Sequence, residues 1–316
     1  MEIEELIKSI QEEKKKAESQ KHSVEGLARL QEVAAQYQGE YKLIWSDELL
    51  AEIKKRPKKI LYKTNIPLLD NLIGGFSEQQ LITLSAHTKH GKTTMGLFLL
   101  GNLESMNPVL IPLEQSNEEI VEQLESNGYN IPRFLSPSKL SAQVTVDWIE
   151  QRVIEGIAKY DTKLVVIDHL GYIDNYGTKG KYARENLAYR IGQVMRELKN
   201  VAKRWNVVIL LLCQISQKDE GNPPTTEDIK NSSDISQESD TIIMLWRKNT
   251  LMKKIRVYEN KTILSVAANR RTGKNGNIGL MFDPATGKYF EDNKWVQDME
   301  TMAMQEIAVN DDFGTP

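Results

Sequence analysis

The sequence predicts an α/β protein in which helices cover both faces of a mainly parallel, twisted sheet. From residue 60 onward, short apolar runs typical of buried strands alternate with stretches whose apolar residues recur at helical spacing. One of these strands runs directly into a phosphate-binding loop and a helix. Of the 316 residues, 40% are hydrophobic, which suffices for one large domain with a small addition. We expect a helical N-terminal segment or linker at 1–59, the α/β domain at 60–295 and an acidic, flexible tail at 296–316.

Composition narrows the class of protein. The net charge of −3 argues against general nucleic-acid binding, so any such contact must come from local loops. The single cysteine excludes an intramolecular disulfide framework and fits a reducing compartment. No apolar run approaches about 18 residues, and the acidic N-terminus lacks the apolar stretch of a signal peptide. We therefore expect a cytoplasmic protein.

The first 60 residues carry only thin apolar stripes at helical spacing. One stripe runs through 45–53, with Ser46 and Asp47 as a plausible cap. Such stripes cannot form a core alone, so they must pack either on the main domain or on a neighbouring subunit. The basic run at 54–59 indicates a linker.

The elements of the main domain follow from its hydrophobic periodicity and its turn residues. Helices are predicted at 66–75, ended by glycines, and at 118–124, 146–157 and 185–205. Strands are predicted at 81–84, 109–113, 164–167, 207–212, 241–245, 264–267 and 278–282. Irregular segments are predicted at 125–145, 172–182 and 216–233, with a turn at 283–287.

The stretch AHTKHGKT at 86–93 fits the phosphate-loop (Walker A) pattern, with Ala86 in place of the first glycine. Main-chain N–H groups of such a loop, and the helix N-terminus behind it, form a concave site for phosphate oxygens. Lys92 is expected to reach the β- and γ-phosphates, and the Thr93 hydroxyl to bind Mg²⁺. ATP and Mg²⁺ are therefore the expected cofactors. The expected nucleotide-binding residues are Ala86, His87, Thr88, Lys89, His90, Gly91, Lys92, Thr93 and Thr94.

Three polar residues stand where predicted strands stop, which is where ligands bind to parallel sheets. Asp168 is the expected carboxylate for Mg²⁺, held directly or through water, or else a cap of the following segment. Glu114 is a candidate general base for the attacking water, or else a cap of the helix after it. Gln214 is a candidate sensor of the γ-phosphate, or else a polar strand end.

Two further features concern cations and metals. The basic, glycine-rich turn at 270–276 is either solvated or the source of an arginine that stabilises charge on a transferred phosphoryl group. The histidines at 22, 87, 90 and 169 show no metal-ligand spacing, and we expect none of them to be a ligand.

Five stretches together resemble DnaB-type replicative helicases, and the resemblance covers about residues 60–292. In order, they are LEQS at 113–116, VVIDHL at 165–170, LLCQIS at 211–216, DIKNSSDISQESDTIIMLWR at 228–247 and RTGKNG at 271–276. The fourth and fifth look closest to phage and organellar members.

The resemblance implies a RecA-like P-loop ATPase core, a ring hexamer with ATP sites between subunits, and translocation along single-stranded DNA. By it, Glu114 is the catalytic base, Asp168 the Mg²⁺ carboxylate, Gln214 the γ-phosphate sensor and Arg271 a finger that reaches a neighbour's ATP. Arg247 and Phe282 match positions that sandwich the base of the bound nucleotide. The family often has a lysine two residues before the finger, where this sequence has Asn269, so a second cation acting in trans is lacking unless Arg270 substitutes for it. By the same resemblance, we expect no large primase or primase-binding domain before the core.

DNA contact is expected from the loops beside the nucleotide site, since phosphate tracking needs only a few cations per subunit. The candidates are Lys179, Lys181, Arg184, Lys218 and Lys230, any of which could instead be solvated surface. The sequence thus favours an ATP-driven replicative helicase, with primase, polymerase or a loader as possible partners, in the host cytoplasm if it is phage-encoded. The alternative is a RecA-like recombination or signalling ATPase that assembles without unwinding.

Overall fold

The computed structural model describes residues 35, 42–173, 187–215, 221–225, 228, 232–253 and 255–297, and the chain divides into two units, 1–58 and 59–316. In the first unit, α3 (Ser46–Lys55) buries none of its residues. Its N-cap residue is Trp45, without a side-chain hydrogen bond, so the expected cap at Ser46 and Asp47 is wrong. Trp45, Leu49, Leu50 and Ile53 are all exposed. The apolar side of α3 therefore has no covering surface within the described part of this unit.

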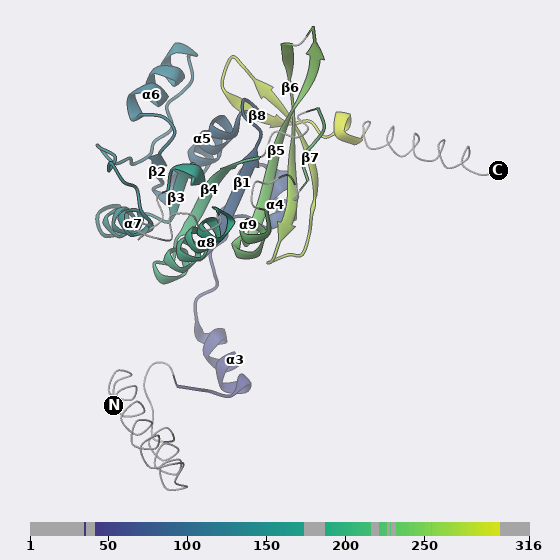
Figure 1. Cartoon of the computed structure of the whole chain (residues 1–316). Coiled ribbons are helices and arrows are strands. Elements are labelled where there is room, and N and C mark those ends of the chain that lie inside the picture. The colour runs from purple at the N-terminus through teal and green to yellow at the C-terminus, as the bar shows by residue number, and fades with distance from the viewer. Residues whose placement is uncertain are drawn as a thin grey trace, which may run out of the picture. The chain divides into compact units, whose positions relative to one another are not determined.

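The second unit is built on an 8-stranded sheet with the order β2-β3-β4-β1-β5-β6-β7-β8 (Figure 1). The strands are β1 (Leu81–Ala86), β2 (Val109–Pro112), β3 (Leu164–Asp168), β4 (Val208–Gln214), β5 (Thr241–Met252), β6 (Ile255–Asn269), β7 (Gly276–Asp283) and β8 (Lys288–Glu291). Strands β2, β3, β4, β1 and β5 are parallel, as expected. Strands β6, β7 and β8 extend the sheet in antiparallel fashion, so the complete sheet is mixed.

Helices cover both faces of the sheet, as expected. They are α4 (Pro67–Ile73), α5 (Lys92–Asn102), α6 (Asn117–Ser126), α7 (Val146–Tyr160), α8 (Leu187–Arg204) and α9 (Ser232–Glu238), with 3-10 turns at Glu104–Met106 and Leu170–Tyr172. Residues of α4, α5 and α6 share one buried cluster, and residues of α7, α8 and α9 share another. Among these helices, none combines the length and the apolar character needed to cross a membrane.

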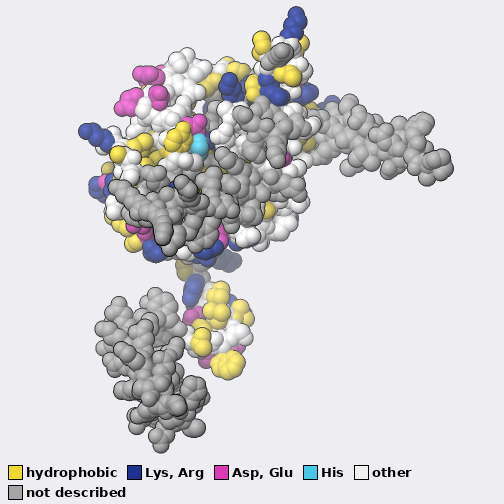
Figure 2. Space-filling model, viewed as in Figure 1, with side chains coloured by type: hydrophobic (Ala, Val, Ile, Leu, Met, Phe, Trp, Pro, Cys, Tyr) yellow, Lys and Arg dark blue, Asp and Glu magenta, His cyan; other side chains and the backbone are white. Residues whose placement is uncertain are grey.

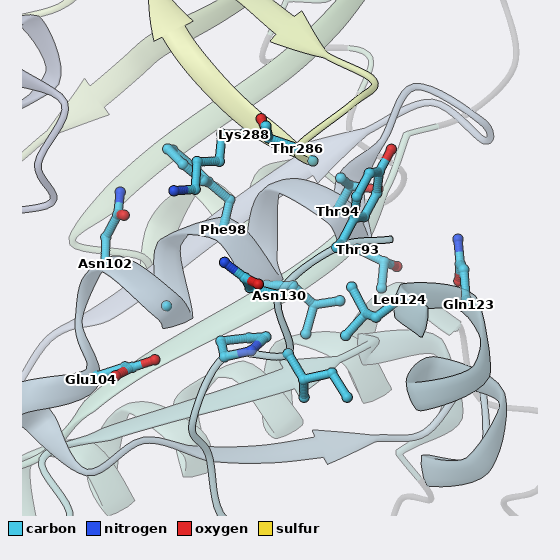
Figure 3. A pocket seen from close by; sticks show the side chains of 16 residues that line it. Thr93, Thr94, Phe98, Asn102, Glu104, Gln123, Leu124, Asn130, Thr286 and Lys288 are labelled. Atoms are coloured by element: carbon cyan, nitrogen blue, oxygen red, sulfur yellow. The ribbon is translucent and has the colours of Figure 1, made fainter. Parts of the chain in front are cut away.

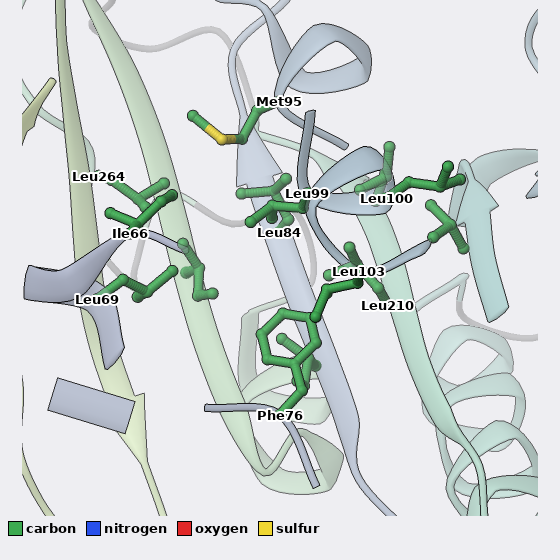
Figure 4. Packing of buried hydrophobic residues seen from close by; sticks show 14 of the residues in the cluster. Ile66, Leu69, Phe76, Leu84, Met95, Leu99, Leu100, Leu103, Leu210 and Leu264 are labelled. Atoms are coloured by element: carbon green, nitrogen blue, oxygen red, sulfur yellow. The ribbon is translucent and has the colours of Figure 1, made fainter. Parts of the chain in front are cut away.

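The two buried clusters lie on opposite faces of the sheet because successive side chains of a strand point to opposite faces. In β4, Leu210 and Leu212 face the cluster under α5, whereas Ile209 and Leu211 face the cluster under α8. Both sets are buried, so the parallel strands are continuous apolar runs rather than alternating ones. Figure 4 shows the first cluster, where side chains from α4 and α5 meet those of β1, β4 and β6. This packing fixes α5, and therefore the phosphate loop that precedes it, on the sheet.

Four elements differ from the predictions. Strands β5 and β6 are much longer than the expected 241–245 and 264–267, because they continue as a hairpin past the end of β1. We call residues 249–257 the β5–β6 arm. Helix α9 begins inside the predicted loop at 216–233, and β8 was not predicted. At the tip of the arm, apolar and basic side chains are exposed together (Figure 2).

Candidate functional site: a phosphate loop at the carboxyl edge of the sheet

The phosphate loop lies where β1 ends and α5 begins. Gly91 is the N-cap residue of α5 at a φ of 89°, a left-handed conformation that glycine adopts without strain. The chain reaches it through Lys89, which is also left-handed at a φ of 68°. Because α5 starts at Lys92, its free main-chain N–H groups and the positive end of its dipole lie at the loop. The strand, loop and helix predicted around this motif are therefore confirmed.

Lys92 occupies the centre of the site. Its Nζ lies 3.1 Å from Asp168 Oδ1 and 3.3 Å from Glu114 Oε2. The lysine side chain is 11% exposed and that of Asp168 is 5% exposed, whereas that of Glu114 is 42% exposed. The ion pair with Asp168 is therefore largely screened from water, and the one with Glu114 is open on one side. The ends of β1, β2 and β3 thus meet in one charged cluster, as the strand-end argument predicted.

Thr93 and Asp168 form an oxygen pair suited to a hard cation. The Thr93 hydroxyl donates to Asp168 Oδ2 at 2.5 Å. Asp168 Oδ1 is buried and, among the described residues, accepts no hydrogen bond beyond its contact with Lys92. A hydroxyl beside an unsaturated carboxylate is the donor set that Mg²⁺ takes at phosphate-loop sites, so the residues present fit the expected metal. Asp168 also ends β3 itself, which leaves its capping alternative without support.

Glu114 stands just past β2, with its carboxylate toward the loop. Helix α6 after it is capped by Ser116, whose hydroxyl accepts from the Glu119 N–H while the Glu119 carboxylate accepts from the Ser116 N–H. The alternative that Glu114 caps this helix is therefore wrong. His169 Nε2 lies 3.5 Å from Glu114 Oε2. Burial, followed by the charge of Lys92, lowers the pKa of His169 below its usual value.

Gln214 ends β4 and contacts the loop directly, because its Nε2 donates to Thr88 Oγ1 at 2.6 Å. This hydrogen bond ties the candidate sensor to the phosphate loop. Cys213 beside it is 1% exposed, and burial raises its thiol pKa to about 12. Cys213 is thus a small buried residue, as expected, and not a nucleophile.

Two adjoining cavities lie at this site. One, of about 400 Å³, is lined by the loop, Glu114 and Gln214. The other, of about 280 Å³, runs along the exposed side of α5 toward the β7–β8 turn and is walled by Phe98 and Tyr129 (Figure 3). Residues 93, 94 and 123 line both. A ligand held by its phosphates in the loop therefore has open space beside it.

Arg247 and Phe282, which the resemblance assigns to binding of the nucleotide's base, lie near each other. The Arg247 guanidinium carbon is 5.8 Å from the Phe282 ring centroid. Arg247 also donates from Nε to Glu259 O at 2.5 Å and from Nη2 to Asn260 Oδ1 at 3.2 Å. The side chain is thus held by β6, with its guanidinium within cation–π distance of both Phe282 and Tyr258.

Arg271 is not part of this cluster. It follows β6, whose residue Asn269 pairs with Thr241 at the start of β5, so it lies at the amino edge of the parallel strands. Its Nη2 donates to the carbonyls of Ile73 and Gly75 at the end of α4. Arg271 therefore cannot serve the phosphate loop of its own chain. Any action on ATP must be on the nucleotide of another subunit.

The five expected DNA-binding cations, Lys179, Lys181, Arg184, Lys218 and Lys230, all lie outside the described residues. The sequence predicted Thr88 and His90 only as members of the phosphate loop and assigned their side chains no individual role. In the structure, Thr88 accepts a hydrogen bond from Gln214, and His90 accepts one from the main-chain N–H of Arg247. Neither is signalled by a pattern, since each depends on which strand lies beside the loop.

Comparison with known proteins finds similarity to replicative DNA helicases. The model of the DnaB-like helicase C-terminal domain matches residues 138–291. A probable replicative DNA helicase of Trieres chinensis is 26% identical over 283 residues, covering 77% of this chain and 61% of its own length. The replicative DNA helicase DnaB of Geobacillus stearothermophilus is 26% identical over 261 residues, covering 72% and 55%. The chain thus spans little more than half the length of these curated relatives.

Solved structures share the fold. A DnaB-like replicative helicase, studied with its primase interactions, superposes with a TM-score of 0.64 at 19% identity, covering 90% of this chain and 76% of that one. A second solved structure, an isolated ATPase domain, gives a TM-score of 0.66 at 20% identity, covering 79% of this chain and all of that one. These similarities show that the second unit has the RecA-like fold of the ATPase domains of DnaB-like helicases, and that residues 138–291 resemble the C-terminal domain of that family.

Proposed function

We propose that the chain is the ATP-driven motor of a replicative DNA helicase, which assembles as a ring hexamer, translocates on single-stranded DNA and unwinds duplex DNA. The observation that carries this proposal is the cluster of Lys92, Glu114, Asp168 and Gln214 around one phosphate loop within a DnaB-like domain. A protein that only bound ATP as a scaffold would not need a carboxylate at the position of Glu114. The resemblance to phage members favours a phage origin, and a replication motor of this kind works in the cytoplasm, the host's for a phage protein.

The contacts of Lys92 suggest how binding and hydrolysis are linked. In the structure, its ammonium is held by the carboxylates of Asp168 and Glu114. Phosphate oxygens in the loop compete for the same ammonium. When Lys92 moves to the phosphates, Glu114 loses its cation and is free to accept a proton from water, as a general base must. Mg²⁺, held by Thr93 and Asp168, would supply charge neutralisation on the phosphates.

The remaining assignments belong to the same proposal. Gln214 would report the γ-phosphate through Thr88, and Arg247 with Phe282 would stack on the base. Arg271 would act on the ATP of the next subunit, and Arg270 would substitute for the lysine replaced by Asn269. The basic residues at 179, 181, 184, 218 and 230 would track the DNA backbone without reading bases. Primase, polymerase or a loader are the partners that replication implies.

The test is unwinding of a forked duplex in the presence of ATP and Mg²⁺, with Lys92→Ala as the inactive control. The proposal predicts strand separation by the unsubstituted protein and none by the variant. ATP hydrolysis stimulated by single-stranded DNA, but without strand separation, would instead support a recombination or signalling ATPase. Negative-stain images with a non-hydrolysable ATP analogue should show six-fold rings, and filaments or monomers would contradict the ring.

A further inference from the structure

His90 joins the phosphate loop to β5. Its ring is 1% exposed, and its Nδ1 accepts a hydrogen bond from the main-chain N–H of Arg247 at 2.9 Å. The contact is between a loop residue and a strand residue 157 positions apart in the chain. It lies next to Gly91 and Lys92, whose placement determines the phosphate site.

The hydrogen bond satisfies a main-chain N–H of β5 that lies beyond the last pair of the β1–β5 ladder. The ladder between β1 and β5 ends with Ala86 opposite Leu245, because β1 turns into the loop there. Arg247 lies beyond that last pair, and the His90 ring takes the place where the neighbouring strand would continue. An acceptor at this point matters, since a main-chain N–H left unsatisfied away from water is costly.

The surroundings of His90 hold the ring in one orientation. The ring centroid lies 5.3 Å from that of His87 and 5.3 Å from that of Tyr258, which meets it edge-on. Burial, followed by the charges of His87, Arg256 and Arg247, lowers its pKa to about 4. The imidazole is therefore neutral at physiological pH, as it must be for Nδ1 to accept a hydrogen bond.

The residue fixed by this bond has its side chain at the proposed base site. Arg247 presents its guanidinium to Phe282 and is held from behind by Glu259 and Asn260 of β6. The loop and the Arg247–Phe282 pair come from different parts of the chain. Among the described residues, His90 is a direct side-chain connection between the two.

We propose that His90 is a positioning residue, which sets the distance between the phosphate loop and the Arg247–Phe282 pair so that the two halves of one nucleotide are bound together. The inference rests on the proposed ATP binding and adds how the phosphate and base subsites are aligned. Misalignment should weaken a ligand that spans both subsites. A ligand that occupies only the loop should be affected little.

The test compares His90→Asn with His90→Gln. The Asn side-chain oxygen stands close to the position of Nδ1 and can still accept from the Arg247 N–H, whereas the Gln oxygen stands near Nε2 and cannot. Affinities are measured for ATP and for inorganic tripolyphosphate, both with Mg²⁺, by competition with a fluorescent nucleotide. KM and kcat for ATP are measured in parallel, and thermal melting reports folding. Should His90→Gln fold poorly, His90→Met provides a second variant that fills the space without an acceptor.

We expect His90→Gln to weaken ATP binding about tenfold, the effect of losing one buried hydrogen bond, and to raise KM by a similar factor. The affinity of His90→Gln for tripolyphosphate should stay within about twofold of that of the unsubstituted protein. The His90→Asn variant should bind ATP about as tightly as the unsubstituted protein does. Equal behaviour of the Asn and Gln variants would overturn the inference, and so would equal weakening of ATP and tripolyphosphate, or a lower melting temperature with unchanged ATP affinity. Failure of the proposed ATP binding looks different, since the unsubstituted protein would then bind no ATP and the inference would fall with it, whereas ATP binding without unwinding of a forked duplex would overturn the helicase function and leave the inference standing.

Discussion

Replacing Lys92 by Met should destabilise the protein as well as inactivate it. Met keeps most of the apolar stem of the side chain and removes the charge. Within the described part of the chain, Lys92 is the cation at ion-pair distance from the nearly buried Asp168 carboxylate. Removing one partner of a buried ion pair typically costs about 3–5 kcal/mol, because the other charge is left uncompensated.

The cost here should be near the lower limit, about 3 kcal/mol, for two structural reasons. The Thr93 hydroxyl still donates to Asp168, and the half-exposed Glu114 gains little from its own contact with Lys92. For a domain of this size, such a loss lowers the melting temperature by about 6–12 °C. Substituting Asp168→Asn in the same chain should recover most of that loss, since no buried charge then remains.

The assay is thermal unfolding without nucleotide for the unsubstituted protein, both single variants and the double variant. ATP hydrolysis is measured alongside, and we expect none from any protein that lacks Lys92. If Lys92→Met melts within about 1 °C of the unsubstituted protein, the Lys92–Asp168 pair does not contribute as its burial implies. Hydrolysis at the unsubstituted rate would refute the assignment of the site itself.

Three other outcomes are expected. Glu114→Gln should bind ATP normally but hydrolyse it about 10²–10⁴-fold more slowly in single-turnover assays, and an unchanged rate would exclude Glu114 as the base. Arg271→Ala should lose on the order of 10³-fold in rate, and rings mixed with Glu114→Gln subunits should regain hydrolysis at interfaces that carry both intact residues. Absence of even a first turnover in rings shown to exchange subunits would contradict action in trans. Deleting residues 1–58 should leave a folded second unit but weaken ring assembly, and hexamers with an unchanged concentration dependence would contradict this.

Sequence reasoning located the site because each of its residues ends or follows a strand that is buried along its length up to that point. Strands β1, β2, β3 and β4 are buried and largely apolar, so their ends are visible in the sequence. The polar residue after each run then lies at a known edge of the sheet. This is why Lys92, Glu114, Asp168 and Gln214 could be placed together before their contacts were known.

The missed elements lack that signal. The β5–β6 arm extends past the sheet with both faces at least partly exposed, so its residues show neither a buried run nor a regular alternation. Helix α9 is short, and Ile235 is the residue it contributes to the core cluster among those whose side chains are described. The contacts of Arg271 depend on where α4 ends, which no local pattern encodes.

The position of Arg271 has a consequence for symmetry. The phosphate loop lies at the carboxyl edge of the parallel strands and Arg271 at their amino edge, so the two belong to different surfaces of the domain. A two-fold dimer uses the same patch on both partners, so it can join Arg271 to a loop only when that one patch includes both, and it then closes at two subunits. A heterologous, head-to-tail contact instead pairs the Arg271 of one copy with the loop of the next and leaves that copy's own Arg271 to act on a third. Repeated contacts of this kind form a closed ring if the rotation that relates neighbouring subunits is a whole fraction of 360°. Otherwise they continue as an open helix of subunits.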